Sequence, residues 1–212
     1  MMKTMMKMMT MMKIGNISTS RTELIDILKA WLAISLAFAF VYANVNLFNG
    51  ALGLFSINFL KMFLISLGTA GIGFLLHELG HKVVAQRYGC AAEFRAFDQM
   101  LYLAVGLAFL VGFIFAAPGA VMIHGMITRK ENGIISLAGP LVNYILAMIF
   151  LGLLSLFPNF SFIFQIGFFI NLWLGLFNMI PFGNFDGIKI FHWNKVIWGM
   201  MVAFGVYFLF VF

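Results

Sequence analysis

The chain has 212 residues, of which 63% are hydrophobic and only 9% are charged. A soluble domain usually carries about 25% charged residues, so the composition excludes an ordinary water-exposed surface. It predicts instead one domain with several membrane spans of about 20 residues each. The formal net charge is +6, but the basic residues lie between apolar runs and accompany no nucleic-acid-binding motif. We therefore expect the lipid bilayer, and no nucleic acid, as their partner.

The N-terminal segment, residues 1–26, begins with the low-complexity sequence MMKTMMKMMTMMK. We expect this basic, Met-rich segment to form a poorly ordered tail. It does not resemble a cleaved signal peptide, because the first apolar run, near Ile27 to Phe48, is too long for one. We expect residues 27–212 to form a single membrane-embedded domain. Cys90 is the only cysteine, so an intrachain disulfide is excluded.

Further apolar runs follow the first, and Gly or Pro residues mark their ends. They are approximately Asn58 to Leu76, Leu101 to Ala117, Ile134 to Phe157, Ser161 to Ile180 and Val196 to Phe212. The run from Asn58 continues with helical periodicity to Tyr88, where Gly89 is placed like a C-terminal capping glycine. The sequence thus predicts an all-α polytopic membrane protein with about five to six transmembrane helices.

The helix that begins at Asn58 contains an H-E-x-x-H motif, in the stretch FLLHELGHK from Phe74 to Lys82. Residues four apart share a helix face, so His77 and His81 can bind one ion, each about 2.0–2.1 Å from Zn²⁺. Glu78 can lie beside a water molecule at the metal and act as general base, then pass the proton to the leaving amine. The motif therefore predicts a hydrolytic site with one zinc ion.

A catalytic zinc ion normally takes three protein ligands, and the motif supplies two. Arg87 stands where an extended metzincin pattern requires His, which excludes that pattern. Three glutamates in polar stretches between spans are alternatives: Glu23, Glu93 and Glu131. Asp186 is the better candidate, because Pro and Gly interrupt the helix around it in the segment NMIPFGNFDG, residues 178–187. Irregular backbone at membrane depth is tolerated only where protein or a water-lined cavity covers it, and an Asp there indicates a functional site.

The motifs resemble those of the site-2 protease family of intramembrane zinc metalloproteases. His77-Glu78-x-x-His81 matches one family motif, and Asn178-x-x-Pro181-x-x-x-x-Asp186-Gly187 matches another. The stretch AGPLVN, residues 138–143, resembles a third shared segment, so that the resemblance covers roughly residues 67–190.

The resemblance implies a role for each matching residue. His77, His81 and Asp186 would bind zinc, and Glu78 would activate water. Asn178 would help to hold the substrate carbonyl or the oxyanion, as a neutral donor can. Substrates would be transmembrane proteins cleaved within or near their membrane segments, as in regulated intramembrane proteolysis.

Zinc binding by both His81 and Asp186 constrains the topology, because the chain must then cross the membrane an even number of times between them. The runs that begin at Ile134 and Ser161 supply two crossings. We therefore expect residues 101–127 to make no net crossing, as a re-entrant segment or as a helix with an extended return over 118–126. Such an extended or short β segment near the site could pair with an unwound substrate by strand addition.

This topology places every Lys and Arg except Lys61 on one side of the membrane. The positive-inside rule makes that side cytoplasmic, which predicts a multi-pass protein of the cell membrane with its site on the cytoplasmic side. Two other functions remain open at this point. One is another zinc-dependent membrane peptidase with a Glu ligand, such as a prenyl-protein protease. The other is an inactive relative that binds or transports metal or acts as a regulator.

Overall fold

The structure is a computed structural model that describes residues 11–14, 17–114 and 118–212. It confirms the predicted fold class, because helices form most of the chain and the strands form two small two-stranded sheets. Within the described residues, four helical segments are long and apolar enough to cross a membrane: Arg21–Tyr42, Ile57–Arg87, Arg129–Leu156 and Pro158–Asn178.

Two shorter apolar helices account for the difference from the expected five to six spans. Helix α5 (Asp98–Val111) has 14 residues and helix α9 (Lys195–Val211) has 17. At 1.5 Å per residue, α5 is about 21 Å long, which is too short for a hydrocarbon core of about 30 Å. Helix α5, which contains most of the apolar run from Leu101, is therefore too short to form a complete span of its own.

The N-terminal segment is more structured than we expected. Strand β1 (Met11–Ile14) pairs antiparallel with strand β2 (Ile17–Ser20), and helix α2 extends over Arg21–Tyr42. Residues 11–14 and 17–26 thus form strands and the start of a helix where we expected a poorly ordered tail, while residues 1–10 and 15–16 lie outside the described residues. Helix α2 starts earlier than its apolar run because the Ser20 hydroxyl caps it by accepting a hydrogen bond from the Glu23 N–H. The apolar run alone does not indicate this first turn of α2, because the residues of the turn are polar.

The helix with the H-E-x-x-H motif is long and nearly continuous. After the short helix η1 (Ala51–Phe55), helix α3 (Ile57–Ser66) leads through a π-helical turn, η2 (Leu67–Gly71), into helix α4 (Ile72–Arg87). Helix α4 ends where the sequence predicts, with Gly89 just beyond it at a φ of 78°.

The segment between α4 and α6 returns to its starting point. Strand β3 (Ala91–Ala96) precedes α5, and strand β4 (Gly119–His124) follows it and pairs antiparallel with β3. The pairing places His124 opposite Ala91, so the segment between α4 and α6 ends next to the point where it begins. A helix followed by an extended return is one of the two forms expected for this segment.

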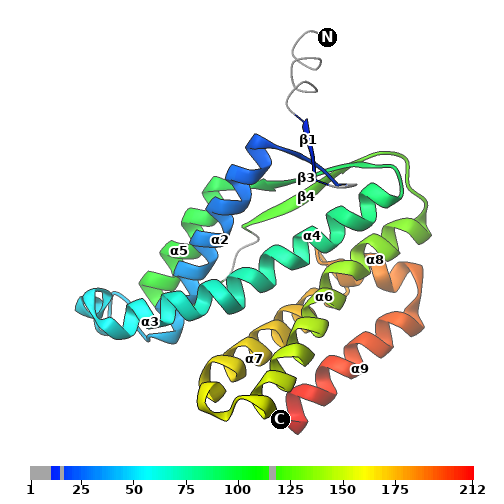
Figure 1. Cartoon of the computed structure of the whole chain (residues 1–212). Helices are drawn as coiled ribbons and strands as arrows, with labels where there is room; N and C mark the ends of the chain where they lie inside the picture. Colours follow the sequence, from blue (N-terminus) through cyan, green and yellow to red (C-terminus); the bar gives the residue numbers. More distant parts are fainter. Residues whose placement is uncertain (1–10, 15–16, 115–117) are drawn as a thin grey trace.

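The remaining helices build the other half of the molecule. They are α6 (Arg129–Leu156), η3 (Pro158–Phe160), α7 (Ser161–Asn178) and α8 (Asp186–Trp193), followed by α9. Helices α4 and α6 pack against each other at the centre, with α2, α3 and α5 on one side and α7, α8 and α9 on the other (Figure 1).

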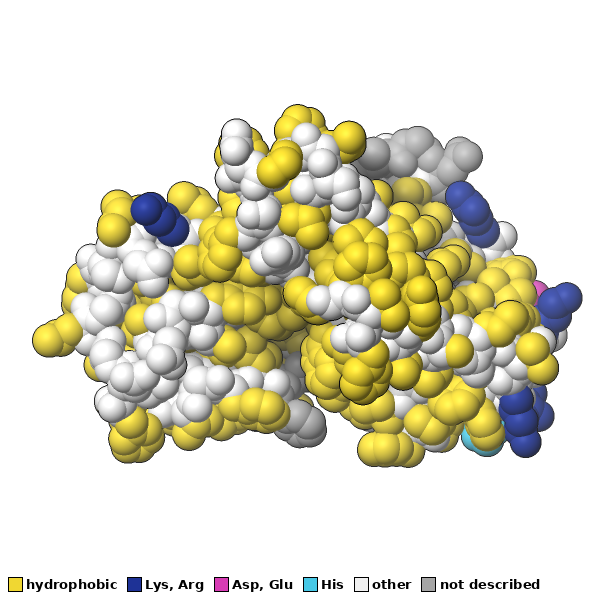
Figure 2. Space-filling model, turned by 90° about the horizontal axis from the view of Figure 1, so that it is seen from below, with side chains coloured by type: hydrophobic (Ala, Val, Ile, Leu, Met, Phe, Trp, Pro, Cys, Tyr) yellow, Lys and Arg dark blue, Asp and Glu magenta, His cyan; other side chains and the backbone are white. Residues whose placement is uncertain are grey.

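The surface is that of a membrane protein. Hydrophobic side chains are spread over the whole face seen in Figure 2, and its few Lys and Arg side chains lie near the margins. Large apolar residues are widely exposed, for example Leu52 at 86% and Phe55 at 87%. Exposed apolar area on this scale requires a non-aqueous environment.

Candidate metal centre

The H-E-x-x-H helix and the start of α8 bring three metal-binding side chains together. The Nε2 atoms of His77 and His81 lie 3.1 Å apart. Oδ2 of Asp186 lies 3.3 Å from Nε2 of His77 and 3.0 Å from Nε2 of His81. All three residues are buried. In the described part of the chain, this is the one group of three such side chains whose ligand atoms converge, and it contains the three zinc ligands expected from the sequence.

Hydrogen bonds behind the imidazoles fix which nitrogen faces the centre. His77 Nδ1 lies 2.6 Å from Oδ1 of Asn143 on α6, and His81 Nδ1 lies 2.8 Å from the carbonyl oxygen of Ile135. Asn143 Nδ2 donates to the Gly73 carbonyl and to Oδ1 of Asn171, so its Oδ1 is the atom turned to His77. Both Nδ1 atoms therefore carry protons, and both Nε2 atoms present lone pairs.

The geometry of the three atoms fits zinc. Two lone pairs and a carboxylate oxygen repel one another at these separations unless a cation lies between them. Ligands about 2.0–2.1 Å from a tetrahedral zinc ion are about 3.3–3.4 Å apart, close to the distances between His77, His81 and Asp186. Three protein ligands also leave one position for a water molecule or substrate, as in catalytic sites.

Helix packing at this point depends on Gly139 of α6. A Cβ atom at Gly139 would lie 2.6 Å from Nε2 of His77 and closer still to Nε2 of His81. Helix α6 can therefore approach the two histidines only because residue 139 has no side chain. Gly139 lies in the AGPLVN stretch, as does Asn143. A buried Asn within an apolar helix was a signal in the sequence, but its hydrogen bond to His77 was not predicted.

Asp186 reaches the histidines from an interruption between α7 and α8. Gly183 in that interruption has a φ of 65°, and a Cβ atom at Gly187 would overlap the backbone of Met179. These glycines let α8 start directly against the end of α7.

Glu78 contacts strand β4. Its Oε2 accepts a hydrogen bond from the backbone N–H of Val121 at 3.1 Å. Glu78 follows His77 directly on α4, so its side chain lies beside the ligand face of the helix without being part of it. The contact ties the expected general base to the edge of β4 that faces away from β3.

Asn178 is placed differently from the other expected site residues. It is the last residue of α7, and its amide nitrogen donates a hydrogen bond to the Leu174 carbonyl of the same helix at 2.9 Å. This side chain is therefore bound to its own backbone, whereas the three ligand atoms meet one another.

The three glutamates considered as alternative ligands are engaged elsewhere. Glu23 pairs with Lys82, and Glu93 pairs with Arg95. Glu131 forms a capping box with Thr128 at the start of α6. None of the three belongs to the ligand group formed by His77, His81 and Asp186.

The fold and the triad together define a membrane protein with a zinc centre of the metalloprotease type. No protein-family model and no solved structure matches the chain. The chain is 42% identical over 186 residues to the "Putative zinc metalloprotease MJ0611" of Methanocaldococcus jannaschii, an alignment that covers 86% of this chain and 90% of the relative. A second relative from that archaeon, "Zinc metalloprotease MJ0392", is 29% identical over 123 residues, which are 56% of this chain and 31% of the relative.

The first match covers most of both chains and therefore shows the family of this protein. The chain belongs to the zinc metalloprotease family of the relative that it matches at 42% identity. Zinc, the cofactor expected from the H-E-x-x-H motif, is confirmed by these relatives together with the His77, His81 and Asp186 group.

Proposed function

We propose that the protein is an intramembrane metalloprotease of the site-2 type, which hydrolyses peptide bonds within or near the transmembrane segments of membrane proteins. The observation that carries this proposal is the triad of His77, His81 and Asp186, buried between apolar helices with Glu78 next to it. An Asp ligand at the start of α8 favours this type over membrane peptidases with a Glu ligand.

The residues divide the chemistry between them. When bound, zinc supplies Lewis-acid polarisation of the scissile carbonyl and lowers the pKa of water towards about 7. Glu78 takes one proton from the attacking water and delivers it to the amine that leaves when the C–N bond breaks. Asn178 donates to the substrate carbonyl or oxyanion, which requires its amide to exchange the Leu174 carbonyl for the substrate.

Strand β4 supplies a docking edge for the substrate. A transmembrane helix hides its carbonyls in hydrogen bonds, so it must unwind before hydrolysis. Successive residues of a strand direct their backbone groups to alternate sides, so Val121 and Ile123 direct theirs away from β3. An unwound substrate segment that pairs with this edge lies next to Glu78.

The protein acts in the cell membrane with its zinc centre towards the cytoplasm. The basic residues support this orientation, because Arg87 ends α4, Arg129 begins α6 and Lys189 lies in the first turn of α8. Single-span proteins with their cleavable segment near that face are the expected substrates.

The proposal is tested with the full chain reconstituted in liposomes with a single-span substrate. We expect product masses to place the cut within or near the membrane segment, and a Gly-Pro pair introduced there to increase the rate by easing unwinding. A zinc chelator should abolish cleavage, and added zinc should restore it. Cleavage confined to soluble peptides, or cleavage that survives chelation, would overturn the proposal.

A further inference from the structure

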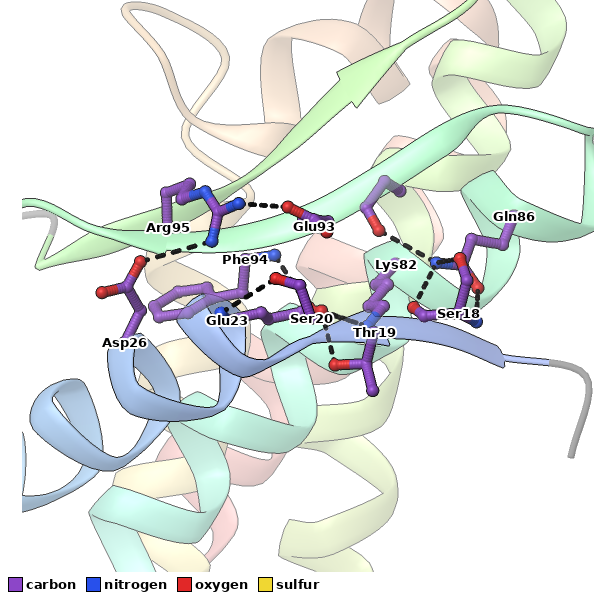
Figure 3. Close-up of polar contacts among 11 residues, drawn as sticks. Ser18, Thr19, Ser20, Glu23, Asp26, Lys82, Gln86, Glu93, Phe94 and Arg95 are labelled. Carbon is purple, nitrogen blue, oxygen red and sulfur yellow. Dashed lines mark hydrogen bonds and ion pairs between the residues drawn. The ribbon is translucent and has the colours of Figure 1, made fainter. Parts of the chain in front are cut away.

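A buried ion pair outside the metal centre joins α2 to α4. Lys82 Nζ lies 2.7 Å from both carboxylate oxygens of Glu23, and the two residues are 2% and 0% exposed (Figure 3). The Thr19 hydroxyl donates a further hydrogen bond to Glu23 Oε2 at 2.7 Å. Well-packed apolar side chains stabilise a fold as well as a buried ion pair does. Stability alone therefore does not account for this arrangement.

Glu23 also holds the outer edge of strand β3. Its Oε1 accepts a hydrogen bond from the Phe94 N–H at 2.9 Å. On the same edge, Gln86 of α4 donates to the Ala92 carbonyl at 2.9 Å. Side chains of α2 and α4 thus satisfy backbone groups of β3 on the side that faces away from β4 (Figure 3).

The register of the sheet connects this contact to Glu78. Phe94 lies directly opposite Val121, whose N–H is the donor to Glu78. The two N–H groups point away from each other, each outward from its own edge of the sheet, as in a non-hydrogen-bonded pair of an antiparallel ladder. Two carboxylates therefore hold the sheet at one register position, Glu23 from the β3 side and Glu78 from the β4 side.

The contacts begin and end on the same helix. They run from Glu78 through Val121 and Phe94 to Glu23, and return to α4 at Lys82. Glu78 and Lys82 are one helical turn apart, a spacing at which Glu and Lys side chains also attract each other. Glu23 thus has two effects on the site, because it anchors the sheet and keeps Lys82 engaged away from Glu78.

We propose that Glu23, held by Lys82, is a positioning residue that fixes the register of β4 against Glu78 and thereby selects the substrate bond that is cut. The cleavage part of this inference rests on the proposed function. The positioning of β4 itself does not, because it concerns contacts within the chain.

Two double variants isolate the hydrogen bond from the charge. Glu23→Gln with Lys82→Met removes both charges but keeps an acceptor for the Phe94 N–H. Glu23→Met with Lys82→Met removes the acceptor as well, with apolar side chains of similar length. Asp98→Asn is the matched control, because it neutralises a carboxylate that pairs with Lys29 of α2 at an exposed position.

The first measurements are the rate of amide hydrogen exchange in residues 119–124, the amount of bound zinc and the unfolding temperature. We expect both double variants to keep zinc and a similar unfolding temperature. The amide hydrogens of this segment should exchange about tenfold faster in the Met/Met variant than in the wild type. In the Gln/Met variant and the Asp98→Asn control, they should exchange at the wild-type rate. Equal exchange in both double variants, or loss of zinc from both, would overturn the positioning role.

The bond that is cut is the second measurement. The Met/Met variant should give additional products whose ends differ by two residues, because a slip of two keeps the same side chains facing the strand. The Gln/Met variant should keep the wild-type cut. A single unchanged cut in the Met/Met variant would contradict the selection of the bond. A wild type that cuts no membrane substrate refutes the proposed function, whereas the exchange measurement still tests the positioning of β4.

Discussion

His77 Nδ1 lies 2.6 Å from Oδ1 of Asn143, and Asn143 is itself held by the Gly73 carbonyl and by Asn171. This fully hydrogen-bonded amide orients the first ligand of the zinc centre from a different helix. Partners of this kind hold the ring in the tautomer that presents Nε2 to the metal.

Asn143→Leu should therefore weaken zinc binding by about 10–100-fold, because His77 loses the acceptor that fixes its tautomer. Zinc affinity is measured by competition with a chelator of known strength. Asn178→Ala is the control, since the Asn178 amide donates to Leu174 and not to a ligand. Equal zinc affinity in Asn143→Leu and the wild type would contradict the role of Asn143.

Gly139→Ala should remove zinc from the protein, because the added methyl group would occupy the space of the His77 and His81 Nε2 atoms. A Cβ atom added at Gly152 on the same helix has no neighbouring atom within 4 Å, so Gly152→Ala should keep zinc. It should also stabilise α6 by roughly 1 kcal/mol, the difference in helix propensity. Metal content after purification distinguishes the two variants. Full zinc occupancy in Gly139→Ala would show that α6 does not approach the histidines as described.

Asp186→Ala should abolish zinc binding, whereas Glu131→Ala should retain it and lose only a capping box, a cost of about 1 kcal/mol. The comparison separates the Asp-ligand centre from the Glu-ligand class of membrane peptidase. Zinc content and thermal unfolding are measured on both variants. Zinc lost from Glu131→Ala and kept by Asp186→Ala would favour the Glu-ligand class.

Cysteines at positions 98 and 128, introduced after Cys90→Ser, should be labelled from the same side of the membrane. The expectation follows from the pairing of β3 with β4 and from the hydrogen bond of the Phe97 N–H to the Pro118 carbonyl at 2.9 Å. A membrane-impermeant thiol reagent applied to sealed vesicles gives the measurement. Labelling from opposite sides would mean that the segment with α5 crosses the membrane.

The sequence was sufficient to predict the features that depend on local pattern. Helical spacing placed His77 and His81 on one face, and the helix break around Asp186 indicated the third member of the group that the structure brings together. The even number of crossings between His81 and Asp186 led to the expectation that the segment around α5 returns.

The features that sequence reasoning missed depend on contacts between distant residues. The polar residues 17–26 appeared to be a tail, because nothing local indicates that Glu23 pairs with Lys82. Asn143 and Gly139 orient and accommodate the histidines through the packing of α6 on α4, which a single sequence does not reveal. The alternation of strand β4 is hidden in a short apolar segment, so its hydrogen bond to Glu78 was not predicted either.

The most direct test of the central claim compares the wild type with Glu78→Gln, with and without a zinc chelator, on one membrane-spanning substrate in liposomes. The wild type should cut the substrate and lose this activity on chelation. Glu78→Gln should bind as much zinc as the wild type and should lose turnover, since removal of a general base costs about 10²–10⁴-fold. Cleavage at the wild-type rate by zinc-loaded Glu78→Gln would contradict the account.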